Sequence, residues 1–168
     1  MGVISMKFIK TIRLKPLLLS LLLPLLSGGA VGLFLALSGK FNTYEELFRP
    51  PFSPPQWLFP VAWTVLYTLM GVSAYLVTTS DASKGAREDA LWQYMMQLGI
   101  NLIWPILFFY FEMRLAAFLW IIVLLMAVFK MIGDFWFISK PAALLQIPYV
   151  LWLLFATYLN GATYLLNG

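Results

Sequence analysis

The chain has 168 residues, of which 62% are hydrophobic and only 11% are charged. A soluble domain usually carries about 25% charged residues, so 11 basic and 7 acidic side chains would not cover the surface of a soluble protein of this length. Because the chain has no cysteine and no histidine, it cannot form a disulfide, a cysteine- or histidine-ligated zinc site, a Ser-His-Asp triad or a histidine-ligated haem. The net charge of +4 does not suggest a nucleic-acid partner, and we expect neither a metal site nor a resident cofactor.

The apolar residues are gathered in five long blocks. A helix that crosses a membrane needs roughly 20 apolar residues, because the hydrocarbon core is about 30 Å thick and each residue rises about 1.5 Å. None of the blocks alternates between apolar and polar residues as a barrel strand does. The sequence therefore predicts an all-α membrane protein, a single domain over residues 1–168 built as a bundle of five transmembrane helices. The predicted spans are residues 17–38, 57–78, 91–111, 115–137 and 142–166.

The first block has two interpretations. Basic residues from Lys7 to Lys15 precede the apolar run Leu17–Leu26, which is the order of a cleaved signal peptide. The apolar run resumes at Val31 and completes a full span, which favours a retained first helix, kinked at Pro24. Seven basic residues on the side of the N-terminus, against three on the other side, predict that the N-terminus lies inside.

The connections between the blocks differ in length. The turn at residues 112–114 is short, so the third and fourth spans should be antiparallel neighbours, and residues 79–90 should form a polar loop. The first connection, residues 39–56, is long: Thr43 and Glu46 fit a capping box for a short helix at about 44–48, and four prolines at 50–55 impose an extended segment. Such a loop is either a lid over a ligand site or a rigid spacer.

Seven tryptophans are the main candidates for function. Trp57 and Trp92 lie at span ends and fit an interfacial belt, whereas three others lie inside spans. Each of these three shares a helical face with further aromatic or polar residues: Trp63 with Tyr67, Trp104 with Asn101 and Phe108, and Trp152 with Ala156 and Asn160. These faces indicate either an aromatic-walled cavity for a large planar apolar ligand or ordinary helix packing with asparagine as glue. Lys40 and Arg49 could meet ligand carboxylates at the mouth of such a cavity.

Two further patterns are open to a structural interpretation. Gly28 and Gly32 allow close helix approach, either within the bundle or in a dimer. Lys130 and Asp134 are spaced to form an i,i+4 pair, which is either structural or part of an ion path.

Several motifs together resemble the translocator protein family, also called tryptophan-rich sensory proteins. They read YEELFRPPFSPP at residues 44–55, FPVAW at 59–63, NLIW at 101–104 and PY at 148–149, followed by Trp152, Ala156 and Asn160. The resemblance covers roughly half the chain. Two positions depart from it, since the family often has tryptophan where this chain has Thr43 and Phe52.

The resemblance implies a five-helix bundle, commonly a homodimer in the membrane lipid, with a cavity under the first loop. Family members bind porphyrins such as protoporphyrin IX as ligands and not as cofactors, and also synthetic isoquinoline carboxamide and benzodiazepine drugs. The C-terminal segment has no Lys or Arg, which argues against the sterol motif of animal members. By motif position, Trp63 and Trp152 correspond to the tryptophans to which light-dependent porphyrin breakdown is attributed. The expected ligand-binding residues are Tyr44, Pro54, Trp63, Tyr67, Asn101, Trp104, Phe108, Trp152, Ala156 and Asn160.

Two functions follow as expectations. The first is a tetrapyrrole-binding protein that senses or regulates porphyrins, with enzymatic breakdown left open. The second is a small transporter of such ligands, although five spans without a visible repeat are unlike transporters built from paired halves. We expect the protein in a bacterial cell membrane.

Overall fold

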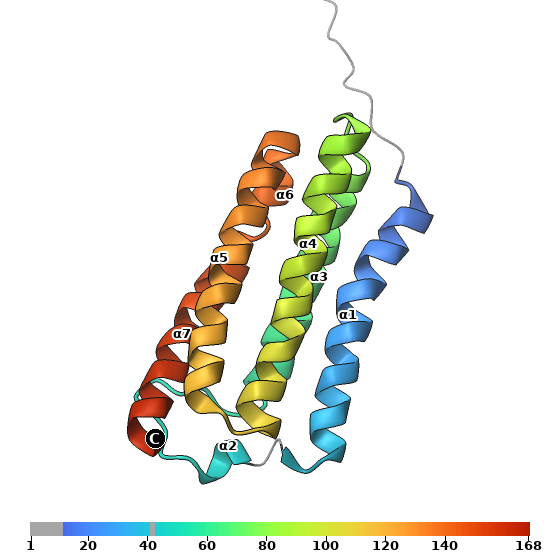
Figure 1. The fold of residues 1–168 in the computed structure, drawn as a ribbon. Helices are drawn as coiled ribbons and strands as arrows, with labels where there is room; N and C mark the ends of the chain where they lie inside the picture. Colours follow the sequence, from blue (N-terminus) through green and yellow to red (C-terminus); the bar gives the residue numbers. More distant parts are fainter. Residues whose placement is uncertain (1–11, 41–42) are drawn as a thin grey trace, which may run out of the picture.

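The computed structural model describes residues 12–40 and 43–168, and these described residues contain helices but no strand (Figure 1). The basic residues Lys7 and Lys10 of the predicted N-terminal tail lie outside them. The elements are α1 (Leu14–Leu37), α2 (Thr43–Glu46), α3 (Leu58–Thr78), α4 (Lys84–Pro105), the π-helical turn η2 (Ile106–Tyr110), α5 (Arg114–Ile138), α6 (Lys140–Leu144) and α7 (Ile147–Asn167).

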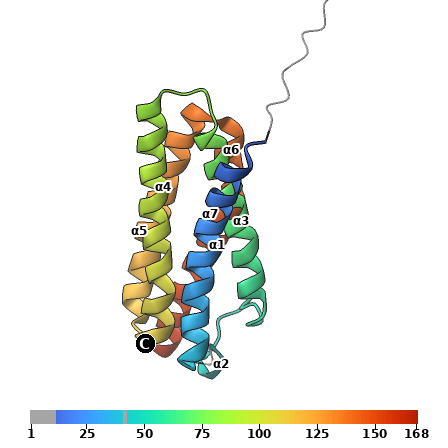
Figure 2. The same ribbon diagram turned by 90° about the vertical axis from the view of Figure 1, so that its right-hand side faces the viewer.

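Five long helices, α1, α3, α4, α5 and α7, run up and down as one bundle within the described part of the chain (Figures 1 and 2). Helix α1 packs on α3, and α5 packs along both α4 and α7. Helix α2 and the C-terminus lie at one end of the bundle, whereas α6 and the α3–α4 connection lie at the other (Figure 1). The prediction of an all-α bundle is therefore confirmed, including the antiparallel pairing of the third and fourth spans.

Within the described residues, four segments are long and apolar enough to cross a membrane: α1, α3, α5, and α6 with α7. Helix α4 is less apolar overall because it begins earlier than predicted, at Lys84 instead of residue 91. The Ser83 hydroxyl accepts a hydrogen bond from the Ala86 N–H at 3.3 Å and caps this start, so the expected polar loop 79–90 shrinks to residues 79–83. Hydropathy identified only the apolar part of α4, because the helix continues beyond that part through residues that are polar.

The predicted fifth span, 142–166, is not one helix. It is divided into α6 and α7 by a break at residues 145–146. Pro148 lies in the first turn of α7, where a missing N–H costs nothing, so a second helix can begin there. Pro141 and the Ser139 cap do the same for α6, which starts two residues before the predicted span. Mean hydropathy does not reveal such a break, because the residues on both sides of it are apolar.

The first helix agrees with its predicted extent, whereas the proline segment of the first loop is not extended throughout. It turns at Pro51 and Phe52, where Phe52 has a φ of 64° and the Ser53 N–H donates to the Pro50 carbonyl at 3.3 Å. Helix α1 contains Pro24 and is mostly exposed, with only Pro24 and Leu35 buried among its residues, as expected for a helix that faces lipid. The short helix predicted at about 44–48 is present as α2. The side chain of Thr43, on which the predicted capping box depends, lies outside the described side chains.

Gly28 brings α1 and α3 into close contact. A Cβ atom at Gly28 would lie 2.1 Å from a ring atom of Tyr67, and one at Gly71 would lie 2.7 Å from the backbone oxygen of Ser20. At Gly32, by contrast, an added Cβ would meet nothing within 4 Å. Of the two interpretations of the glycine pair, packing within the bundle is thus correct for Gly28, and Gly32 borders an open space.

Candidate functional site

The open space beside Gly32 is a cavity of about 160 Å³ between α1, α3 and α4. The aromatic rings of α3 and α4 form one wall, and small and aliphatic residues of α1 form the other. Its lining comprises Leu25, Gly28, Val31, Gly32, Leu35, Phe59, Pro60, Trp63, Thr64, Tyr67, Asn101, Trp104, Pro105 and Phe109.

Trp63 stands at the centre of an aromatic cluster. Its ring stacks on that of Tyr67 with centroids 5.4 Å apart, and it lies 6.5 Å from Trp104 and 6.5 Å from Trp152. Trp63, Trp104 and Trp152, which the sequence analysis took from three separate helices, therefore meet around Trp63. Trp152 touches this cluster from α7 but lies outside the lining of the cavity.

A second, smaller hollow of about 20 Å³ lies under the first loop. It shares Phe59, Trp104 and Phe109 with the larger cavity, so these three rings form the partition between the two spaces. Tyr44 and Ser53 of the loop form its roof. The other lining residues are Phe108, Ala156, Leu159, Asn160 and Thr163.

Both intramembrane asparagines are buried and hydrogen-bonded. Asn101 accepts from the Tyr67 hydroxyl at 2.8 Å and donates to the Tyr149 hydroxyl at 2.9 Å. Asn160 accepts from the Trp104 indole N–H at 3.1 Å and donates to the Ala156 carbonyl at 2.7 Å. Each asparagine therefore joins helices and also lines a hollow. Helix packing and an aromatic-walled space, which the sequence analysis gave as alternatives, are both present.

The first loop is held across the end of the bundle by side chains of α7. Asn167 accepts from the Phe48 N–H at 2.9 Å and donates to the Phe48 carbonyl at 3.0 Å. The Tyr158 hydroxyl donates to the Pro51 carbonyl at 3.1 Å. Within the loop the Tyr44 hydroxyl donates to the carbonyl of buried Pro54 at 3.3 Å.

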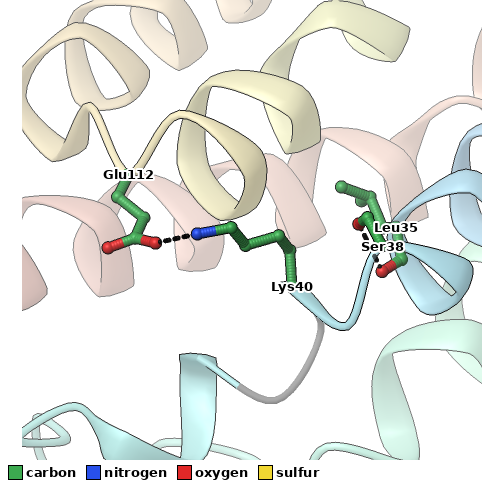
Figure 3. A network of polar contacts seen from close by, with 4 residues as sticks. All are labelled: Leu35, Ser38, Lys40 and Glu112. Atoms are coloured by element: carbon green, nitrogen blue, oxygen red, sulfur yellow. Dashed lines mark hydrogen bonds and ion pairs between the residues drawn. The ribbon is translucent and has the colours of Figure 1, made fainter.

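An ion pair fastens the start of the loop to the α4–α5 turn. Lys40 Nζ and Glu112 Oε1 are 2.7 Å apart (Figure 3). This contact raises the pKa of the Lys40 ammonium and lowers the pKa of the Glu112 carboxyl. The Arg49 guanidinium lies 5.6 Å from the centre of the Tyr44 ring, and burial raises the pKa of the Tyr44 hydroxyl. Lys40 and Arg49 were both expected at the mouth of the cavity. Arg49 lies beside Tyr44, which lines the smaller hollow, whereas Lys40 pairs with Glu112.

The structure brings together most of the predicted site residues. Trp63, Tyr67, Asn101 and Trp104 line the larger cavity, and Tyr44, Trp104, Phe108, Ala156 and Asn160 line the smaller hollow. Pro54 and Trp152 are in contact with these residues without lining either space.

Sequence reasoning missed several members of the site. Phe59 and Phe109 lie within or beside the quoted motifs but were not singled out. The wall formed by α1 could not be predicted, because that helix carries no polar or aromatic signal on the cavity side. Asn167 is a polar residue at the end of an apolar span, but its partner is a backbone segment that no residue pattern reveals.

In the described part of the chain, a helical bundle with four strongly apolar spans defines an integral membrane protein, and an aromatic-walled cavity lies between α1, α3 and α4. The model of the TspO/MBR family matches residues 20–165. The chain is 39% identical over 151 residues to the tryptophan-rich protein TspO of Archaeoglobus fulgidus, covering 90% of this chain and 97% of that one. It is 36% identical to the translocator protein of Bos taurus over 83% of this chain and 82% of that one. It is 34% identical to the tryptophan-rich sensory protein of Cereibacter sphaeroides over 74% and 76%.

The chain therefore belongs to the TspO/MBR family, the family of the translocator proteins and tryptophan-rich sensory proteins. This confirms the resemblance that the sequence motifs indicated.

Proposed function

We propose that the protein binds a tetrapyrrole such as protoporphyrin IX from the membrane and senses or regulates its level. The proposal rests on the aromatic wall around Trp63, where flat rings of α3, α4 and η2 line one side of a space with few polar groups. Planar apolar ligands gain most from such walls, because aromatic rings offer large contact areas and favourable stacking. The polar groups of Asn101 and Asn160 are already paired, so ligand contact falls mainly to the ring faces.

Binding requires the site to enlarge. Pockets for drug-sized ligands measure about 300–1,000 Å³, whereas the cavity here is about 160 Å³. Movement of the partition rings Phe59, Trp104 and Phe109 would join the cavity to the hollow below the first loop. This favours the lid interpretation of residues 39–56 over a rigid spacer, since the loop forms the roof of that hollow and a few hydrogen bonds of about 0.5–1.5 kcal/mol each hold it in place.

Light-dependent breakdown of the bound porphyrin is a second activity of the same site in this proposal. Trp63 and Trp152 are 6.5 Å apart, and Trp63 borders the cavity, so an excited ligand would lie against an oxidisable indole. Transport is the alternative; the relative in Bos taurus is named a translocator protein, and that name is its support.

The remaining proposals concern the setting of the protein. We place it in a bacterial cell membrane with its N-terminus inside, because Arg13, Lys15, Lys84, Arg87 and Lys140 share one end of the bundle. Among the described residues, the basic residues at the other end of the bundle are Lys40, Arg49 and Arg114. A homodimer surrounded by membrane lipid is the assembly we propose.

The experiment is an absorbance titration of protoporphyrin IX with detergent-purified protein, in darkness and then under illumination. Wild type should give a saturable shift in the dark and loss of the porphyrin bands in light. Trp63→Phe and Trp152→Phe should keep the dark shift and lose most of the light reaction. A dark shift without any light-dependent loss would leave binding alone, and no shift in wild type would overturn the proposed function.

A further inference from the structure

A groove of about 520 Å³ lies between α4 and α5, at the end of the bundle that carries the α3–α4 connection. Its lining includes Asp89, Trp92, Gln93, Lys130, Asp134 and Phe137. We propose that this groove binds the headgroup of a zwitterionic phospholipid that carries a primary ammonium group. The proposal is independent of the porphyrin site, because the groove shares no lining residue with the cavity beside Trp63 or the hollow under the first loop.

The position of the groove selects a lipid as the occupant. On α4 it spans the boundary between the polar first turns of the helix and its apolar remainder, with Asp89 on one side and Trp92 on the other. Trp92 is 67% exposed, and exposed tryptophan is typical of the membrane–water interface because its ring is amphipathic. Phe137 is 91% exposed and offers an apolar surface beside it. A headgroup occupies the same depth, and its glycerol and upper acyl chains would lie against these rings.

The charges of the groove select the class of headgroup. Lys130 Nζ lies 2.9 Å from Asp134 Oδ2, and Asp89 adds a second carboxylate, so the groove carries one cation and two anions. A net negative groove disfavours an anionic lipid. A primary ammonium donates three hydrogen bonds, for which the two carboxylates and the Gln93 amide oxygen are acceptors, while Lys130 can bind the phosphate. A quaternary ammonium has no N–H to donate and gains less from these acceptors.

Neighbouring charges are occupied elsewhere. Lys84 and Glu88 pair with each other at 3.7 Å, and Arg87 donates to the carbonyls of Ser80 and Ala82. Charged side chains in membrane spans normally face the bundle interior, yet the Lys130 side chain is 63% exposed, and the pair borders this outer groove instead of the central cavities. An ion path, one of the two interpretations of Lys130 and Asp134, would require both side chains to line a route through the interior of the bundle. A bound headgroup requires them to line the outer groove, as they do.

The test titrates delipidated full-length protein with dioleoyl phosphatidylethanolamine, phosphatidylcholine or phosphatidylglycerol and measures retained lipid by native mass spectrometry. Wild type should bind the ethanolamine lipid at least about fivefold more tightly than either of the others. Asp89→Asn and the double variant with Asp134→Asn should reduce that preference stepwise to within about twofold. Glu88→Gln changes the charge by the same amount one residue outside the groove and should leave the preference intact.

Three results would overturn the proposal. They are equal binding of all three lipids by wild type, a preference for the choline or glycerol lipid, or an ethanolamine preference that survives in the double variant. Circular dichroism and size exclusion of each variant check that it is folded, and Asp89→Asn alone still tests the site if the double variant is not.

Discussion

A single methyl group at Gly28 should disrupt the aromatic wall from the side of α1. The added Cβ would lie 2.1, 2.6 and 2.8 Å from three ring atoms of Tyr67, whereas carbon atoms in contact prefer about 3.5–4.0 Å. The ring would have to move by more than about 1 Å to restore that separation. Such a movement breaks both its stacking on Trp63 and its 2.8 Å hydrogen bond to Asn101.

The magnitude follows from three effects. Overpacking a core costs about 1–3 kcal/mol. Loss of the Tyr67–Asn101 hydrogen bond adds about 0.5–1.5 kcal/mol. Replacing glycine with alanine inside a helix recovers about 1 kcal/mol. The net loss for Gly28→Ala is about 0.5–3.5 kcal/mol, which corresponds to a melting temperature lower by roughly 1–14 °C for a chain of this size.

The assay is thermal unfolding in detergent, followed by circular dichroism, with Gly32→Ala as the matched control. Gly32 lies one turn further along α1 and an added Cβ there meets nothing within 4 Å, so this variant should be as stable as wild type or more stable. In a Tyr67→Leu background Gly28→Ala should lose most of its cost, because the clashing ring is gone. Equal stability of Gly28→Ala and Gly32→Ala would show that the Tyr67 ring does not resist the added methyl group.

Three further predictions follow from the same contacts. Asn167→Leu removes both hydrogen bonds to Phe48, so amide hydrogen exchange at residues 43–56 should be at least about fivefold faster, as expected for the loss of about 1 kcal/mol; unchanged exchange would show that the loop is held otherwise. Gln146 is fully buried and neither atom of its amide has a partner among the described residues, so Gln146→Met should raise the melting temperature by a few degrees, and a lower value would contradict this. The pKa of Glu112 is lowered by its pairing with Lys40, so the pair stabilises the folded state fully above the ordinary pKa of glutamate and this contribution is lost as the pH falls through the lowered value. The protection factors of the first-loop amides, which are corrected for the intrinsic pH dependence of exchange, should therefore fall in acid, and Glu112→Gln should remove that fall. A fall that survives in the variant would assign it to another group.

The five helices could be predicted because span length is a property of one segment alone, as the apolar block of α5 illustrates. The ends of the helices depend on other chemistry. The cap at Ser83 and the proline at Pro148 are visible in the sequence, but a reading based on hydropathy gives them no weight, so the early start of α4 and the break before α7 were missed.

The site divides in the same way. Trp63 with Tyr67, and Trp104 with Asn101, lie on shared helical faces, so spacing along one helix was enough to group them. Contacts between segments that are far apart in the sequence could not be predicted. The approach of Gly28 to Tyr67 and the bond of Asn167 to the backbone of Phe48 depend on how whole helices pack, and no residue pattern specifies that in advance.

In the proposed function, the ligand binds in the cavity beside Trp63. Gly32→Leu would fill that cavity, whereas Gly29→Leu adds the same side chain to the same helix at an exposed position where an added Cβ also meets nothing within 4 Å. The measurement is the dissociation constant of protoporphyrin IX, obtained from quenching of tryptophan fluorescence under weak ultraviolet excitation with ambient light excluded. We predict that Gly32→Leu weakens binding at least about tenfold, equivalent to about 1.4 kcal/mol, while Gly29→Leu binds like wild type. Equal affinity of the two variants would contradict the claim and place the ligand elsewhere on the protein.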